Sequence, residues 1–163
     1  MGRIVGIDLG TTNSLVAYVD AQTGQPKCIP GPYGSTLCPS VVSLDPDGSV
    51  IVGEAARRRL LTQPERSIYS VKRLMGRGVE DVQDELKLFP FRIAEGSESV
   101  IRVVLGDTTF TPPEVSAMIL RQLRKNAEAG LGATVSEPGL TVPAHFNDGH
   151  RQAPPDAGAL AGV

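Results

Sequence analysis

One short stretch near the amino terminus combines the residue types that bind phosphate. It runs Gly-Ile-Asp-Leu-Gly-Thr-Thr-Asn-Ser over residues 6–14. Gly10 lets a ligand approach the backbone closely, and a turn here can direct successive amide N–H groups inward as an anion-binding nest. Thr11 and Thr12 add hydroxyl donors. Asp8 precedes the turn, where a carboxylate can hold Mg²⁺ through water, because magnesium keeps several of its waters. The stretch therefore predicts an anion cradle beside a metal anchor.

The same residue types are common in ordinary hairpin turns, so Asp-x-Gly-Thr-Thr alone leaves a purely structural turn open as an alternative. Two other phosphate-binding loops are excluded, because the chain contains neither Gly-x-x-x-x-Gly-Lys-Ser/Thr nor Gly-x-Gly-x-x-Gly. The choice between a structural and a functional turn therefore depends on what the rest of the chain supplies.

The elements around this stretch predict how it is held. Apolar, β-rich runs lie on both sides of it, at residues 4–7 and 14–19. They predict a strand, a tight turn and a returning antiparallel strand. Residues 41–44 and 50–52 flank an Asp-Pro-Asp-Gly turn and predict a second hairpin. We therefore expect the chain to open with a β-meander.

Helices and short strands are predicted next. Residues 54–61 have helical composition, and Pro64 cannot continue a helix. Ile68, Val71, Leu74 and Met75 recur at helical spacing, and Gly76 is placed to end a helix there. Residues 79–88 predict another helix, with acidic residues in its first turn. Short strands are expected at residues 91–94, 100–105 and 108–110.

The helix expected after residue 111 has the clearest signals. Thr111 and Glu114 have the spacing of a capping box, and Pro112 falls at the first helical position, which proline favours. Gly130 is expected to end this helix. Apolar residues recur on one helical face, at Val115, Met118, Ile119, Leu123 and Ala127.

The last part of the chain is less regular. Residues 140–142 predict a strand, and we expect the Glu-Pro-Gly sequence at 137–139 to interrupt the chain before it. Residues 146–161 have helical composition apart from Pro154 and Pro155. These prolines exclude one unbroken helix, because a proline inside a helix costs about 3 kcal/mol.

The 163-residue chain has the composition of a soluble globular protein, with 40% hydrophobic and 21% charged residues. Its net charge of -2 provides no basic excess, so nucleic acid is not an expected partner. No apolar run approaches the roughly 18 residues of a membrane span, and no secretory signal is recognised. Cys28 and Cys38 are expected to be reduced thiols in a cytoplasmic protein. His145 and His150 lack further ligand candidates, so no histidine metal site is expected.

Three segments, taken in order, resemble one known family. Residues 4–14 are similar to the opening of DnaK-type heat-shock chaperones, members of the actin-like ATPase superfamily. Residues 70–77, Ser-Val-Lys-Arg-Leu-Met-Gly-Arg, resemble the family's lysine segment and in particular its HscA branch. Residues 141–148 resemble its Val-Pro-Ala-Tyr-Phe motif, with His145 in the tyrosine's place. The resemblance implies a mixed α/β fold, the actin-like ATPase or ribonuclease H-like lobe.

The resemblance also implies a division of labour around ATP or ADP and Mg²⁺. Asp8 would bind the hydrated magnesium, and Gly10, Thr11, Thr12 and Asn13 would hold the phosphates, with Thr12 facing the γ-phosphate. Lys72 would position the attacking water and stabilise charge in the transition state. Losing one preorganised donor of this kind typically costs about 3 kcal/mol of barrier. Pro143 and Arg151 match positions that relay the nucleotide state to the peptide-binding domain; a strand-ending proline and a surface arginine remain alternatives.

Members of this family are several times longer than the chain, although the resemblance covers essentially all of it. We therefore expect an amino-terminal part of the nucleotide-binding domain, with residues 1–38 and 112–163 as a core subdomain and 39–111 as an inserted peripheral subdomain. A nucleotide gripped from one side is expected to bind no more tightly than about 1 mM. For the full-length protein the resemblance implies unfolded polypeptides, a J-domain co-chaperone and a nucleotide exchange factor as partners.

Two alternatives to an ATP-driven chaperone stay open. A sugar or polyol kinase of the same superfamily also opens with Asp-x-Gly-Thr, although the segments at residues 72–76 and 142–144 argue against it. A truncated product without activity, or one that only docks co-chaperones, is the other. The leading hypothesis is ATP-driven binding and release of unfolded polypeptide.

Overall fold

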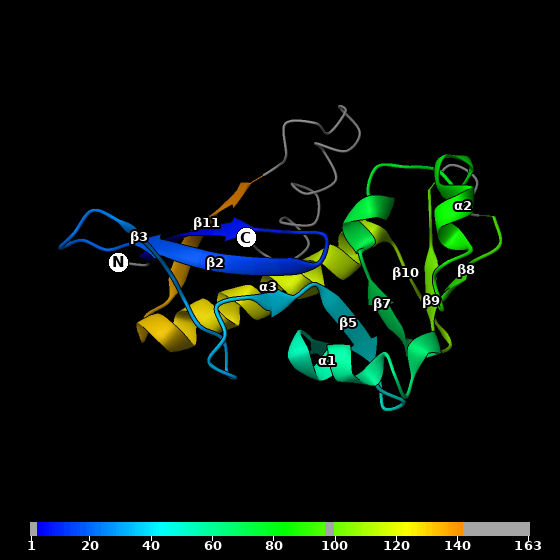
Figure 1. Ribbon diagram of the computed structural model, residues 1–163, viewed down its shortest axis with the longest axis horizontal. Coiled ribbons are helices and arrows are strands. Elements are labelled where there is room, and N and C mark those ends of the chain that lie inside the picture. The colour runs from blue at the N-terminus through cyan, green and yellow to red at the C-terminus, as the bar shows by residue number, and fades with distance from the viewer. Residues whose placement is uncertain (1–2, 97–99, 142–163) are drawn as a thin grey trace.

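The computed structural model describes residues 3–96 and 100–141, which contain three β-sheets and one long helix (Figure 1). Strands and helices are interspersed along the chain, as expected for a mixed α/β fold. The long helix, α3 (Pro112–Leu131), packs against strands of the first and second sheets. It therefore holds the parts of the described structure together.

The first sheet has the strand order β11-β1-β2-β3. β1 (Arg3–Asp8) and β2 (Asn13–Val19) are antiparallel, with Asp8 opposite Leu15, so the predicted opening hairpin is confirmed. β3 (Pro26–Cys28) continues the sheet, and the short β4 (Cys38–Pro39) pairs with the start of β2. On its other edge β1 pairs in parallel with β11 (Val135–Thr141).

β11 corrects one prediction about the end of the chain. Glu137, Pro138 and Gly139 do not interrupt the chain before this strand but lie within it, opposite Ile4, Val5 and Gly6 of β1. Among the described residues, β11 is the last strand on its side of the sheet. A proline is tolerated there, because an edge strand has no second neighbour to which every N–H must donate.

The second and third sheets are built from the middle of the chain. β5 (Val41–Leu44) pairs with β6 (Val50–Val52), which confirms the second predicted hairpin, and with β7 (Ser67–Tyr69). The helix α1 (Glu54–Arg59) follows β6, close to the predicted bounds. β8 (Arg92–Ile93), β9 (Val103–Leu105) and β10 (Thr108–Phe110) form the third sheet at three of the predicted strand positions.

The helix predicted through residues 68–75 is wrong in its first half. Ile68 lies in β7 opposite Val42, and only Val71–Leu74 form a short 3-10 turn, η2. Ser70 separates the two elements, because its left-handed backbone, with a φ of 54°, interrupts the extended conformation of β7. The predicted helix at 79–88 is likewise shorter and divides into η3 (Glu80–Val82) and α2 (Gln83–Leu86). A further 3-10 turn, η1 (Pro64–Arg66), precedes β7.

The capping box predicted for α3 is confirmed. The Thr111 hydroxyl accepts from the Glu114 amide at 3.4 Å, and the Glu114 carboxylate accepts from the Thr111 amide at 2.7 Å. Gly130, however, does not end the helix; Gly132 does, with a φ of 60°. Gly130 instead lies against Ile29, where an added Cβ would come within 2.5 Å of Ile29 Cγ2. A close approach between helix and loop, and not a cap, explains this glycine.

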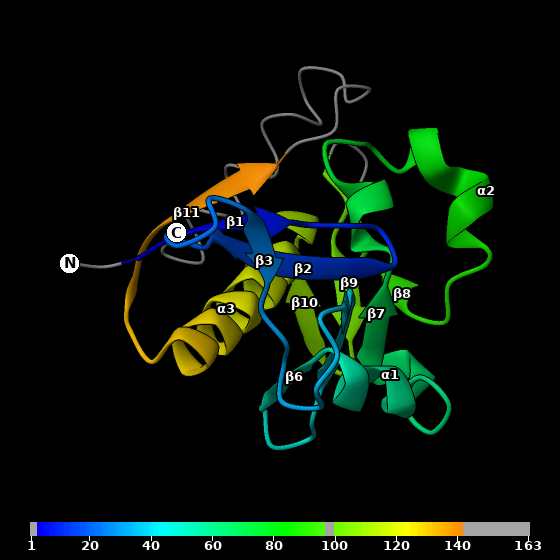
Figure 2. The same cartoon turned by 60° about the vertical axis from the view of Figure 1, so that its left-hand side comes forward.

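The core is continuous between the sheets and α3. Figure 2 shows α3 below the β1–β2–β3 sheet, with the strands of the middle region beside it. Buried residues from all these elements form one hydrophobic cluster, including Ile7, Val16, Val42, Leu105, Ile119 and Leu123. Since Val5 and Ile7 of β1 and Leu9 directly after it belong to this cluster, the turn that follows β1 is attached to a rigid base.

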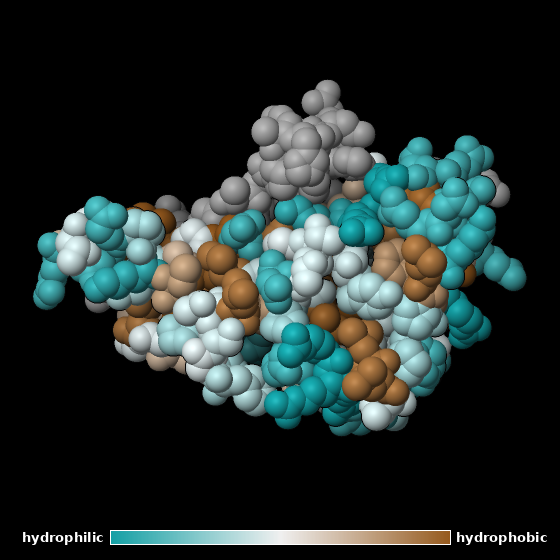
Figure 3. Space-filling model, viewed as in Figure 1, coloured by the Kyte–Doolittle hydropathy of each residue, from teal (hydrophilic) through white to brown (hydrophobic). Residues whose placement is uncertain are grey.

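Hydrophilic residues gather over α1, with its three arginines, and around α2 and the β2–β3 turn (Figure 3). Among the described residues, no helix combines the length and apolar character that crossing a membrane requires.

Candidate functional site

The turn from Leu9 to Thr12 joins β1 to β2 and is too tight for any side chain at Gly10. A Cβ placed there would lie 1.9 Å from the Asn13 carbonyl oxygen. The Gly10 N–H donates to Ser14 Oγ at 3.2 Å, so this amide is used inside the protein. Gly10 therefore allows the tight turn, while its own amide is bonded to Ser14 inside the protein.

A second serine, Ser40, directly follows β4 and also bonds to the turn. Ser40 Oγ donates to the Gly10 carbonyl at 2.8 Å and lies 2.8 Å from Ser14 Oγ. The Ser40 amide also donates to the Thr12 carbonyl at 2.9 Å. Ser14 and Ser40 are almost completely buried. The turn is thus tied to the strand beside it and has a defined conformation.

The polar groups named in the sequence stretch remain accessible. Asp8, Thr12 and Asn13 are exposed, and Thr11 is half-buried. The carbonyls of Leu9, Gly10 and Thr12 accept hydrogen bonds from inside the protein, while the side chains of the turn remain accessible. Such a turn can bind an anionic ligand at the surface. Asp8 is one exposed carboxylate, and the described residues contain no group of three His, Cys, Asp or Glu that could hold a metal directly. This donor set fits a hydrated Mg²⁺ held through water.

Lys72 reaches this turn from η2. Its neighbours Val71 and Leu74 are buried and anchor the 3-10 turn, while its ammonium Nζ donates to the Leu9 carbonyl. Burial lowers the pKa of Lys72 below its ordinary value near 10.5, and the nearby Asp8 carboxylate acts against this by raising the pKa. The structure therefore brings a cation and a carboxylate, 64 positions apart in the sequence, to the two sides of one turn.

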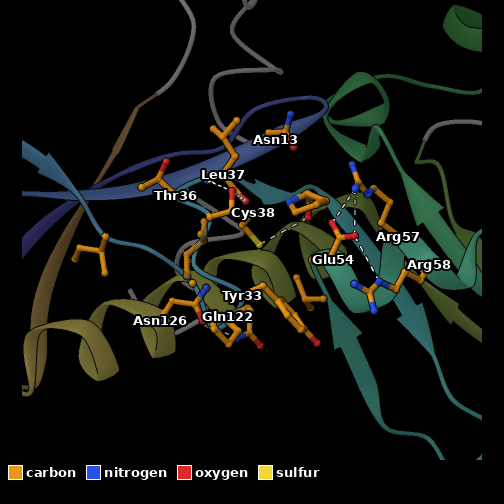
Figure 4. Close-up of a pocket in the computed structure, with 18 residues that line it drawn as sticks. Asn13, Tyr33, Thr36, Leu37, Cys38, Glu54, Arg57, Arg58, Gln122 and Asn126 are labelled. Carbon is orange, nitrogen blue, oxygen red and sulfur yellow. Dashed lines mark hydrogen bonds and ion pairs between the residues drawn. The ribbon is translucent and has the colours of Figure 1, made fainter.

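A separate cavity of 490 Å³ lies beside β4, between the 31–37 loop, α1 and α3 (Figure 4). It shares Asn13 with the turn, but Asp8 and Lys72 do not line it. The charged and amide groups on its wall are paired with one another: Glu54 with Arg57 and Arg58, and Gln122 with Asn126. The cavity therefore has no convergent set of charges aimed at a ligand.

Arg57, Arg58 and Arg59 form the basic part of α1. Their ion pairs with Glu54 and Asp45 agree with a solvated helix face and not with an anion site.

The two cysteines are free, as expected. Cys28 lies opposite Ala17 and Cys38 opposite Ser14, three positions apart along β2. That separation corresponds to about 10 Å, beyond the roughly 7 Å that a disulfide can bridge. Burial raises the pKa of the Cys38 thiol. Cys38 is therefore an unreactive packing residue on the cavity wall.

Several predictions from the sequence concern residues outside the described part of the chain: the roles of Pro143 and Arg151, the absence of a metal site at His145 and His150, and the helical segment 146–161. Of the residues that shape the turn, Ser40 was missed. It follows a Cys-Pro pair at the start of a β-rich run, and nothing in the local sequence indicates that it folds back on Gly10.

The comparison with known families gives one match. The family model described as "Hsp70 protein" matches residues 4–163 and so includes the turn, η2, α3 and β11. The match agrees with the resemblance to heat-shock chaperones and favours a chaperone ATPase over a sugar or polyol kinase.

Proposed function

The chain belongs to the Hsp70 family, and on this premise we propose that its β1–β2 turn binds the terminal phosphates of Mg·ATP in a chaperone ATPase. Membership gives the chain the actin-like ATPase fold, and Hsp70 proteins as a family are ATP-dependent chaperones that bind unfolded polypeptides and co-chaperones. We further propose that the chain is of the DnaK or HscA type and acts in the cytoplasm. Its proposed partners are a J-domain co-chaperone and a nucleotide exchange factor.

One observation supports the proposal more than any other. Lys72 donates to the carbonyl of Leu9, 63 positions earlier in the chain, inside the turn that contains Gly10 and Thr11. A half-buried lysine costs desolvation energy, as the lowered pKa of Lys72 indicates. This half-buried lysine lies beside an accessible turn and near the Asp8 carboxylate. A cation and a carboxylate at one turn are suited to phosphoryl chemistry.

The proposed roles are those that the family resemblance implies, and the exposure of the turn's side chains is compatible with them. Asp8 holds hydrated magnesium, and the bound metal would neutralise charge on the phosphates. Thr11, Thr12 and Asn13 contact the phosphates from the accessible side of the turn, with Thr12 toward the γ-phosphate. By the family resemblance, Lys72 would position the attacking water and stabilise charge in the transition state.

The assay has to detect weak binding of nucleotide, because the expected affinity is no tighter than about 1 mM. We would titrate the isotope-labelled chain with Mg·ATP and follow backbone amide signals by NMR, which detects millimolar dissociation constants. Saturable shifts at residues 8–13 and at Lys72 are expected, and chelation of the magnesium should reduce them. Adenosine, which lacks phosphates, is the matched ligand control and should leave the turn unchanged.

Two substitutions and a control assign the residues. Asp8→Asn should weaken the magnesium dependence, and Lys72→Ala should weaken ATP binding. Lys87→Ala is the control, because the Lys87 side chain is 74% exposed and lies on the remote α2 region. If Mg·ATP leaves residues 8–13 unshifted in the wild-type chain, the proposed function is wrong.

A further inference from the structure

Ser14, Ser40 and Gly10 form a closed ring of hydrogen bonds. Ser40 has one hydroxyl hydrogen, which it donates to the Gly10 carbonyl at 2.8 Å. The Ser14 hydroxyl must then donate to Ser40 Oγ across their 2.8 Å contact, and it accepts from the Gly10 N–H at 3.2 Å. Each hydroxyl donates once and accepts once. Both polar backbone groups of Gly10 are therefore satisfied by two side chains.

Burial makes this ring costly to break. Ser14 and Ser40 are 1% and 2% exposed. A buried polar group that loses its partner pays a desolvation penalty larger than the net gain of an ordinary hydrogen bond. Because every member of the ring depends on the next, Gly10 has little freedom to rotate either of its peptide groups.

The ring determines where the neighbouring amides point. All peptide bonds in the described residues are trans, and in a trans peptide the C=O and N–H bonds point in opposite directions. Since Ser40 Oγ holds the Gly10 carbonyl, the Thr11 N–H is directed away from Ser40. The Ser40 amide holds the Thr12 carbonyl in the same way, so the Asn13 N–H is also directed away from it.

We propose that Ser14 and Ser40 are positioning residues that orient the Thr11 and Asn13 amides toward a bound phosphate. Lys72 completes the arrangement, because it holds the Leu9 carbonyl while Ser14 holds the N–H of the same peptide group. This inference rests on the proposed function for the identity of the ligand. Neither serine touches the ligand; both act through the backbone of Gly10 and Thr12.

The structure offers a matched control. Ser43 and Ser67 form another buried serine pair, with Ser67 Oγ 3.0 Å from Ser43 Oγ and both residues at 0% exposure. Ser43 Oγ donates to the Arg66 carbonyl at 3.3 Å, in the second sheet and away from the turn. Ser43→Ala therefore removes a buried serine hydroxyl with similar local bonds but no connection to Gly10.

The test compares Ser40→Ala with Ser43→Ala in the full chain, using two measurements. Hydrogen exchange of the Gly10 amide, without nucleotide, should accelerate about tenfold in Ser40→Ala and stay at the wild-type rate in Ser43→Ala. The NMR titration should show Mg·ATP binding weakened about tenfold by Ser40→Ala and unchanged by Ser43→Ala. Thermal unfolding of both variants establishes that each retains the fold.

Each result has a defined meaning. Equal Gly10 exchange in the two variants, or equal losses of affinity, would overturn the positioning role. If the wild-type chain binds no Mg·ATP, the proposed function fails, and Gly10 exchange still decides whether the ring orders the turn.

Discussion

Replacing Gly10 by alanine tests the geometry of the turn most directly. The alanine Cβ would stand 1.9 Å from the Asn13 carbonyl oxygen, whereas ordinary contacts of this kind begin at 3.4 Å. The shortfall of about 1.5 Å lies deep in the repulsive range. The opposing atom belongs to the backbone, so no side-chain rotation can relieve the clash.

The loss in free energy of unfolding can be estimated from the steric overlap and the hydrogen bonds that the substitution breaks. Overpacking of a rigid site costs about 1–3 kcal/mol. Moving Gly10 or Asn13 also breaks the bonds of Gly10 to Ser14 and Ser40, each worth about 1 kcal/mol. We therefore expect Gly10→Ala to lower the free energy of unfolding by about 3–5 kcal/mol, a large part of the stability of a domain this size.

Gly6→Ala is the matched control. Gly6 lies in β1, four residues earlier, and a Cβ there would meet nothing within 4 Å. Its substitution should be neutral or stabilise the protein by about 0.5–1 kcal/mol, since glycine is entropically costly in a strand. Urea unfolding followed by circular dichroism measures both variants. A Gly10→Ala variant within about 1 kcal/mol of Gly6→Ala would refute the described turn.

Three further predictions follow from other parts of the structure. Thr111→Ala removes the capping box of α3 and should destabilise the protein by about 1 kcal/mol in urea unfolding; no loss of stability would contradict the cap. Gly130→Ala should destabilise the protein through contact with Ile29, and adding Ile29→Ala should recover part of the loss, which a double-mutant cycle would reveal as non-additivity. In Cys28→Ser, alkylation of Cys38 should rise only above the ordinary thiol pKa of 9.0, because burial raises this pKa in the folded state. The same shift means that the folded state loses stability as the pH rises beyond 9.0 toward the raised pKa, and identical labelling profiles with and without denaturant would contradict it.

Local signals in the sequence predicted the first hairpin, the second hairpin and the start of α3, because each depends on residues close together in the chain. The capping box is an example, since Thr111 and Glu114 bond to each other's backbone. Lys72 was also found from sequence, through its motif and its two apolar neighbours. Its partner, the Leu9 carbonyl, could not be found this way, because a backbone oxygen carries no sequence signal.

The errors arose where tertiary contacts decide between equal local patterns. Ile68, Val71 and Leu74 have helical spacing, but a strand followed by a 3-10 turn buries the same three side chains. Ile68 joins the sheet because Val42 is available opposite it, 26 positions earlier. Ser40 was missed for a similar reason: its place beside Gly10 results from the pairing of β4 with β2, which spacing along the chain does not indicate.

The parallel pairing of β1 with β11 has a consequence for synthesis on the ribosome. β1 can pair with β2 as soon as that strand is synthesised. The other edge of β1 stays unpaired until β11, which ends at Thr141, has been synthesised. At 5–20 residues per second the wait lasts roughly 7–27 s. Through that interval a strand with an apolar face offers unpaired N–H and C=O groups to any other nascent chain nearby. A protein from a family that protects unfolded polypeptides thus passes through a vulnerable state of its own.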